Sequence, residues 1–278
     1  MPDLINLARY PVDSPGDALQ AAITAARRDL QRDGCAVLRG FLTASGVAAL
    51  AAEAEGVADQ GHRSHSRTNA YFTADDPALP ESHPRRRFFE RSNAFIPADN
   101  FLPGGPLRRV FDHSGFDEFI RQCLQEPKAR FHRYADPLAD AMVNMAEAGG
   151  GFPWHFDTNN FTVTLAIQNA EEGGEFQYAP MIRKGSENFD EVSRVLDGTS
   201  DKVKSLRLEP GDLQLFKGRY SLHRVAPLRG PTRRYVAILS YVEEPGMVGS
   251  PERTRQLYGR VLPIHLERAG LRADAYID

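Results

Sequence analysis

The sequence predicts an antiparallel β barrel or sandwich that is supported by helices near the N-terminus. Short strand candidates, separated by Gly, Asp and Pro turns, recur between residues 161 and 241. Apolar residues at helical spacing precede them in the first 60 residues. A chain of 278 residues is within the range of one such domain, and no linker or internal repeat divides it.

The first 60 residues are expected to form a helical support. Residues 17–32 carry Leu19, Ile23, Ala26 and Leu30 at helical spacing, and Gly34 follows as a candidate C-cap. A short apolar strand is expected next, and a second helix runs to about residue 55. A further short helix is predicted over residues 116–124.

The barrel core is expected at about residues 130–245. Residues 161–168 alternate strictly, with Val163, Leu165 and Ile167 on one face. Residues 176–178, 213–216, 221–225 and 235–241 are further strand candidates. Residues 62–106 are read as loop with short strands, residues 182–206 as a helical insertion, and residues 251–278 as a helical tail.

Composition narrows the class of protein. The net charge is −3, which gives no general attraction to nucleic acid or to an anionic membrane. No apolar run approaches the length of a membrane span, and no signal peptide is recognised, so a cytoplasmic protein is expected. Cys35 and Cys123 form no C-x-x-C pair and are read as reduced, packed thiols. Composition leaves the oligomeric state open, including a homodimer.

A candidate metal site lies in the run Trp154-His155-Phe156-Asp157. Residues two apart in a strand point to the same side, so His155 and Asp157 present an imidazole and a carboxylate together. His223, on a later strand candidate, supplies a third ligand. Two histidines and one carboxylate on one face suit Fe(II) and leave open coordination positions.

An arginine follows this set on the next strand candidate. A 2-oxo acid that chelates iron through its keto oxygen and one carboxylate needs a cation for its other carboxylate. Arg234 suits this role because a guanidinium grips a carboxylate with two hydrogen bonds and stays charged when buried. Arg233 is the alternative, since a one-residue slip exchanges the two faces of a strand.

These motifs resemble the 2-oxoglutarate/Fe(II) dioxygenase superfamily, with His155 and Asp157 followed by residues 211–216, 222–225 and 234–236. Residues 171–176, 217–223 and 244–247 resemble more narrowly a bacterial group of free-amino-acid, notably lysine, radical halogenases and their hydroxylase relatives. The resemblance covers about residues 130–262. It implies a mainly β double-stranded β-helix of jelly-roll or cupin-like form, which uses Fe(II), 2-oxoglutarate and O2.

The resemblance also implies a reaction. In the halogenases of this group, Gly or Ala replaces the carboxylate ligand, so that chloride can bind the iron. This chain keeps Asp157, which predicts hydroxylation of an unactivated C–H bond in a small, amino-acid-like substrate. The same oxidative chemistry can also end in desaturation, cyclisation or halogenation. The rivals are a zinc-dependent cupin-like hydrolase or isomerase, which has no need of Arg234, and a non-catalytic binding barrel.

Candidate substrate residues come from two stretches. Asn69 and Tyr71 lie in an irregular segment that could fold over the barrel mouth or form an ordinary loop. Trp154, Thr158 and Asn159 flank the metal ligands and could contact substrate, pack on the rim or form a polar turn. Ser240 shares strand parity with Arg234 and is expected to line the cofactor pocket.

Overall fold

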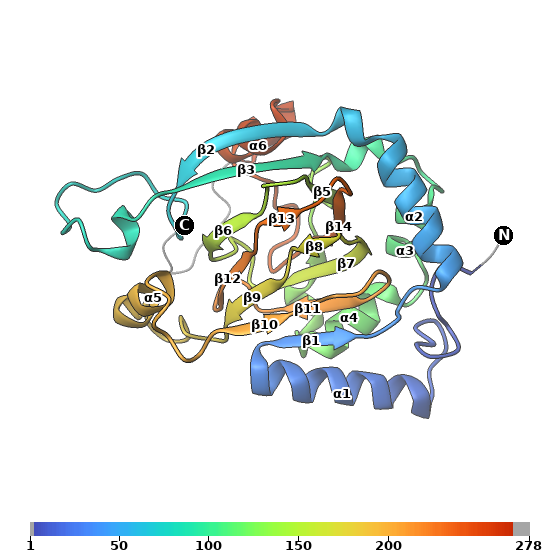
Figure 1. Cartoon of the computed structure of the whole chain (residues 1–278). Helices are drawn as coiled ribbons and strands as arrows, with labels where there is room; N and C mark the ends of the chain where they lie inside the picture. The colour runs from blue at the N-terminus through green and yellow to red at the C-terminus, as the bar shows by residue number, and fades with distance from the viewer. Residues whose placement is uncertain (1–2, 269–278) are drawn as a thin grey trace.

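Two antiparallel sheets form the body of the molecule in the computed structural model, which describes residues 3–268 (Figure 1). The seven-stranded sheet has the order β1 (Cys35–Leu38), β11 (Leu213–Phe216), β7 (Thr162–Gln168), β14 (Arg234–Leu239), β5 (Ala141–Ala146), β3 (Phe89–Ile96) and β2 (His62–Thr68). The four-stranded sheet has the order β10 (Lys204–Leu206), β9 (Phe176–Ala179), β12 (Leu222–Val225) and β6 (Phe152–His155). Two short ladders pair β13 (Leu228–Arg229) with β8 (Glu172–Gly173), and β15 (Tyr241–Val242) with β4 (His132–Arg133).

Helices support the larger sheet, as the sequence predicted. The first four are α1 (Asp17–Asp33), α2 (Ala44–Gly56), α3 (Pro106–Phe111) and α4 (Phe116–Leu124). Helix α1 buries the predicted apolar stripe and ends at Gly34, whose positive φ of 64° closes the helix at little cost. Helix α2 begins after Thr43, whose side chain accepts a hydrogen bond from the Gly46 amide. Side chains of these helices and of the sheet form the largest apolar cluster.

Alternate side chains of β7 point to opposite sides of the larger sheet, one side facing this core and the other facing the space between the two sheets. Val163, Leu165 and Ile167 belong to the cluster shared with the helices. Thr162 and Thr164, on the opposite face, line a pocket that both sheets enclose. The period of two that was read from the sequence therefore defines the helix-covered face and the pocket face.

The segment 62–106 differs from the prediction of a loop with short strands. Strands β2 and β3 pair along seven residues, from His62 opposite Phe95 to Thr68 opposite Phe89, and extend the larger sheet (Figure 1). Strand β2 is polar almost throughout, so it shows no apolar alternation. Its pairing with β3 stabilises it, which a local pattern does not reveal.

The predicted insertion and tail are partly helical. Residues 182–206 contain α5 (Phe189–Leu196) and end in β10, which pairs with β9. The tail contains two helices, α6 (Pro251–Tyr258) and α7 (Pro263–Glu267), and its residues 269–278 lie outside the described part. Short 3-10 helices occur at Ala58–Gln60, Pro84–Arg86, Ala98–Asn100 and Lys128–Arg130. Both cysteines are free and buried. None of the helices in residues 3–268 combines the length and hydropathy needed to cross a bilayer.

Candidate metal centre

Three side chains meet where β6 and β12 pair in the smaller sheet. His155 ends β6 and lies opposite His223 in β12, and their ring centroids are 4.1 Å apart. Asp157 follows two residues after His155, and its Oδ1 lies 3.5 Å from Nε2 of His155 and 3.4 Å from Nε2 of His223. One ligand atom from each residue lies within 4.8 Å of the others, so the group could hold a metal ion.

The hydrogen bonds of the two histidines free the same ring nitrogen in each. Nδ1 of His155 lies 2.8 Å from the Pro153 carbonyl, and Nδ1 of His223 lies 2.9 Å from the Ser221 carbonyl. Because a carbonyl only accepts, Nδ1 carries the hydrogen and donates in both rings. Nε2 is therefore the nitrogen left for metal ligation in both rings.

Burial and neighbouring charges set the protonation states of His155 and Asp157. Burial lowers the pKa of His155 to about 4, and the neighbouring His223 adds to the shift while Asp157 opposes it. Burial alone would raise the pKa of Asp157, but the two imidazoles outweigh that effect and lower it well below its usual value. At neutral pH His155 is thus neutral and Asp157 is ionised, which are the forms that bind metal.

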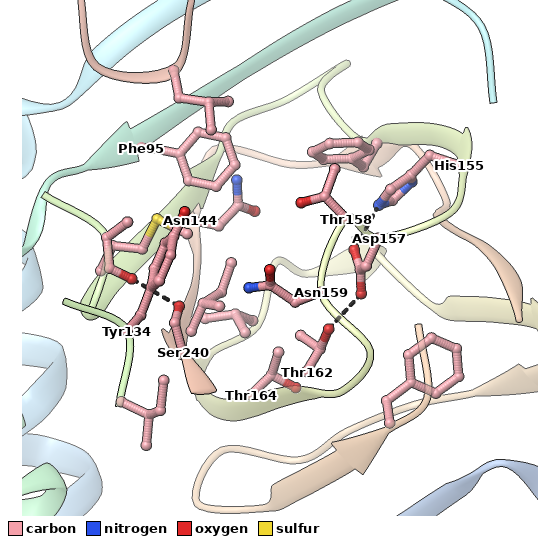
Figure 2. Close-up of a pocket in the computed structure, with 18 of the residues that line it drawn as sticks. Phe95, Tyr134, Asn144, His155, Asp157, Thr158, Asn159, Thr162, Thr164 and Ser240 are labelled. Atoms are coloured by element: carbon pink, nitrogen blue, oxygen red, sulfur yellow. Dashed lines mark hydrogen bonds and ion pairs between the residues drawn. The ribbon is translucent and has the colours of Figure 1, made fainter. Parts of the chain in front are cut away.

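Asp157 is held from two sides. Its Oδ2 accepts a hydrogen bond of 2.5 Å from the Thr162 hydroxyl (Figure 2). Its backbone amide donates to the Gly218 carbonyl. A Cβ atom on Gly218 would lie 1.8 Å from Oδ2 of Asp157. The carboxylate therefore occupies its place only because residue 218 has no side chain.

The two adjacent arginines face opposite ways. Arg234 is 6% exposed and lines the pocket, whereas Arg233 points outward to ion pairs with Glu55 and Glu147. Gly174 lies against the Arg234 side chain, since a Cβ there would be 3.2 Å from Cδ of Arg234. Burial lowers the pKa of Arg234 to about 10, so it remains charged at neutral pH. Within residues 3–268, no hydrogen bond or ion pair satisfies its guanidinium.

The candidate substrate residues fall into two groups. Thr158 and Asn159 line the pocket together with Ser240, the residue expected in the cofactor pocket, and Figure 2 shows Asn159 between the His155–Asp157 pair and Ser240. The Ser240 hydroxyl donates to the Ala139 carbonyl. The other three candidates, Asn69, Tyr71 and Trp154, are buried but do not line the pocket.

The loop that carries Asn69 and Tyr71 reaches the pocket through a different residue. The Asn69 side chain accepts from the amides of Tyr71 and Thr73 and donates to the carbonyls of Thr73 and Arg85. This turn holds Phe72 at a positive φ of 58°, with its ring against the pocket. Asn69 therefore shapes the turn, and Phe72 contacts the interior.

Sequence reasoning missed several polar residues of the pocket. Asn144 on β5, Thr162 on β7 and Arg253 on α6 all line it. The parity of the 161–168 strand could have identified Thr162, since it shares a face with Thr164. Arg253 belongs to a tail rich in charged residues and has no local signal that distinguishes it.

Comparison with known proteins identifies the family. The family model HalD, Halogenase D, matches residues 18–250. No curated protein matches the sequence. Among solved structures, the chain resembles the non-heme alpha ketoglutarate dependent epimerase SnoN from nogalamycin biosynthesis, with a TM-score of 0.56, 16% identity, and coverage of 81% of this chain and 82% of that chain. AviO1 from Streptomyces viridochromogenes gives a TM-score of 0.53, 18% identity and coverage of 86% and 100%.

A prolyl hydroxylase from Trichoplax adhaerens gives a TM-score of 0.52 at 17% identity, with coverage of 81% of this chain and 90% of that chain. At such identities the likeness concerns the fold, and it confirms the prediction of a double-stranded β-helix. The family model covers most of the chain, including all three residues of the candidate metal centre and Arg234. This chain therefore belongs to the Halogenase D family and has the fold of the 2-oxoglutarate- and Fe(II)-dependent oxygenases.

Proposed function

We propose that this chain is an Fe(II)- and 2-oxoglutarate-dependent dioxygenase that hydroxylates an unactivated C–H bond of a small, amino-acid-like molecule. His155, Asp157 and His223 would hold the iron, and Arg234 would bind the distal carboxylate of 2-oxoglutarate. With O2, this metal and co-substrate supply the oxidising power for the reaction. The protein holds the reactants and keeps water out.

The observation that carries the proposal is that the triad and the Arg234 guanidinium open into one pocket. An unpaired cation is costly to bury, so Arg234 favours an anion in this pocket. A zinc hydrolase could use the triad, but it has no use for a buried guanidinium beside it. A dicarboxylate that chelates the metal at one end satisfies both features.

Asp157 favours hydroxylation over halogenation. Its carboxylate lies at nearly equal distance from the two histidine Nε2 atoms, as a third ligand would. The hydrogen bond from Thr162 and the close approach of Gly218 hold it there. A halide would need that position, so we infer that this member of the family transfers hydroxyl to its substrate.

The test is a calorimetric titration with 2-oxoglutarate, under argon, of protein loaded with Mn(II) in place of iron. Arg234→Ala should raise the Kd at least about tenfold, because a charge-assisted, two-point contact is lost. Arg233→Ala is the matched control and should change the Kd less than about twofold. The reverse pattern would assign the co-substrate to the other face of β14.

Metal and oxygen dependence tests the rival chemistry. Fe(II)-loaded protein should form succinate from 2-oxoglutarate only when O2 is present, and a hydroxylated product gains the mass of one oxygen atom. Asp157→Ala should abolish this product. Turnover of a substrate that persists in strict anaerobiosis with zinc would support the hydrolase or isomerase instead.

A further inference from the structure

A second positive region lies on the α6 side of the pocket, away from Arg234. Arg253 lines the pocket, and its guanidinium lies 4.1 Å from the centroid of the Phe72 ring. The Phe72 ring is in turn 5.5 Å from the His155 ring. Phe72 thus links Arg253 to the candidate metal centre, and a molecule held by Arg253 can extend to the metal.

No carboxylate neutralises this region. The Arg253 side chain donates to the Gln256 side-chain carbonyl, and within residues 3–268 it forms no ion pair. Arg91, fully buried behind the pocket wall, lies 4.3 Å from the centroid of the Phe152 ring. None of its three side-chain nitrogens has a hydrogen-bond partner among the described residues. Arg91 is fully buried and Arg253 is partly buried, and neither has a carboxylate partner among the described residues, so the pocket favours an anionic ligand here.

The acidic groups that line the pocket are already engaged. Asp136 accepts from the amides of Leu138 and Gly249, and lies 3.0 Å from Nε2 of His265. Asp157 belongs to the candidate metal centre. Among the described lining residues, no other carboxylate is present. A substrate with a cationic end, such as a free lysine-like amine, would find no free acidic partner.

The charges around the pocket also indicate the sign of the charge on the substrate. A divalent metal, the 2-oxoglutarate dianion, Asp157 and Arg234 together carry no net charge. Arg91 and Arg253 then add positive charge on the α6 side, which a substrate carboxylate held by Arg253 offsets. The walls on this side are mainly apolar, with Phe72, Phe95, Met142, Phe152, Ile238 and Leu257.

We infer that the substrate is a monocarboxylate with an apolar body, which Arg253 binds through the carboxylate while the body lies along Phe72 and Phe152 toward the metal. This inference rests on the proposed function and narrows its substrate class. An amino acid with an acylated amine belongs to the class, because acylation removes the positive charge for which the described lining residues hold no free carboxylate. A free diamino acid does not.

Direct binding tests the inference without turnover. Protein loaded with Mn(II) and 2-oxoglutarate under argon is titrated with hexanoate, octanoate, 3-phenylpropanoate and N-acetyl-leucine, and with the primary amide of each. Hexylamine, lysine and hexyl phosphate complete the series. At least one acid should bind at least about tenfold more tightly than its amide, the amines and the phosphate. Tighter binding of an amine or of the phosphate, or no measurable binding of any acid, would overturn the inference.

Variants of Arg253 test where the carboxylate of the bound acid lies. Arg253→Gln should weaken the best acid at least about tenfold and leave its amide unchanged, and Arg253→Lys should recover part of the loss. Arg255, exposed on the same helix, provides the matched control Arg255→Gln, which should bind as the wild type does. Equal affinity of Arg253→Gln and wild type for the acid would reject this site. Because 2-oxoglutarate binding is measured first in each variant, failure of the co-substrate site is distinguished from failure of this inference.

Discussion

Short-range contacts fix the orientation of the candidate metal ligands. Each histidine donates from Nδ1 to the carbonyl of the residue two positions earlier in its own chain. Strand geometry thus fixes ring orientation and tautomer together, without a carboxylate behind either ring. Asp157 is positioned instead by Thr162 and by the backbone of Gly218.

Gly218→Ala should displace the Asp157 carboxylate, since the added Cβ would meet Oδ2 at 1.8 Å. We expect Mn(II) affinity to fall at least about tenfold, in the range seen when contacts that orient a ligand are lost. Gly56→Ala is the control, because a Cβ at that position, the end of α2, meets nothing within 4 Å. Unchanged Mn(II) affinity in Gly218→Ala would show that the carboxylate can adjust.

The residues of the site differ in how far the sequence predicts them. His155, Asp157, His223 and Arg234 belong to motifs with strand parity, so their meeting in one pocket was predictable. Arg253 was not, because it comes from the tail helix and reaches the pocket only through the packing of α6 on β2 and β3. Non-local packing leaves no periodic signal in the sequence.

At the scale of elements, the alternation of apolar and polar residues determined which strands could be predicted from the sequence. Strand β7 carries its large apolar side chains on one face only, so its pattern predicts both its existence and its orientation. The hairpin β2–β3 is polar along β2, and its register follows from pairing with a partner more than 20 residues away. The loop between these strands contains the turn at Asn69, whose role depends on contacts with residues up to Arg85.

Asn69→Ala should loosen the turn that presents Phe72. The substitution removes hydrogen bonds to Tyr71, Thr73 and Arg85 from a fully buried site. We expect the free energy of unfolding to fall by about 1–3 kcal/mol in urea titrations, with 2-oxoglutarate affinity unchanged. The control Asn100→Ala affects a partly exposed turn and should cost less. An equal loss of stability in both variants would show that the Asn69 hydrogen bonds stabilise the protein no more than those of an ordinary turn.

In the molecule as a whole, the core and the pocket occupy opposite faces of the larger sheet. Helices α1 to α4 pack on one face with the largest apolar cluster, and the other face lines the pocket. This division allows buried charges to be present on the pocket side without interrupting the main core. The cost of those charges should appear in the stability of the metal-free protein.

The titration of His155 should make the stability of the metal-free protein depend on pH. Its pKa is about 4 in the folded chain, below the value of 6.5 of a free imidazole, because the ring is buried and next to His223. The unfolded chain therefore binds the additional proton first as the pH falls. The stabilisation is fully present above pH 6.5 and is lost progressively as the pH falls toward 4.

Urea unfolding of the metal-free protein, with a chelator present, should show this loss. Between pH 7 and pH 5, the His155 shift should lower the free energy of unfolding by about 2 kcal/mol. His155→Asn lacks the titrating group and its interactions with His223 and Asp157, so its stability should decline less over the same interval. Parallel pH profiles for wild type and variant would mean that the His155 imidazole is not held neutral by the fold, and that the metal centre must expel a proton before it can bind a cation.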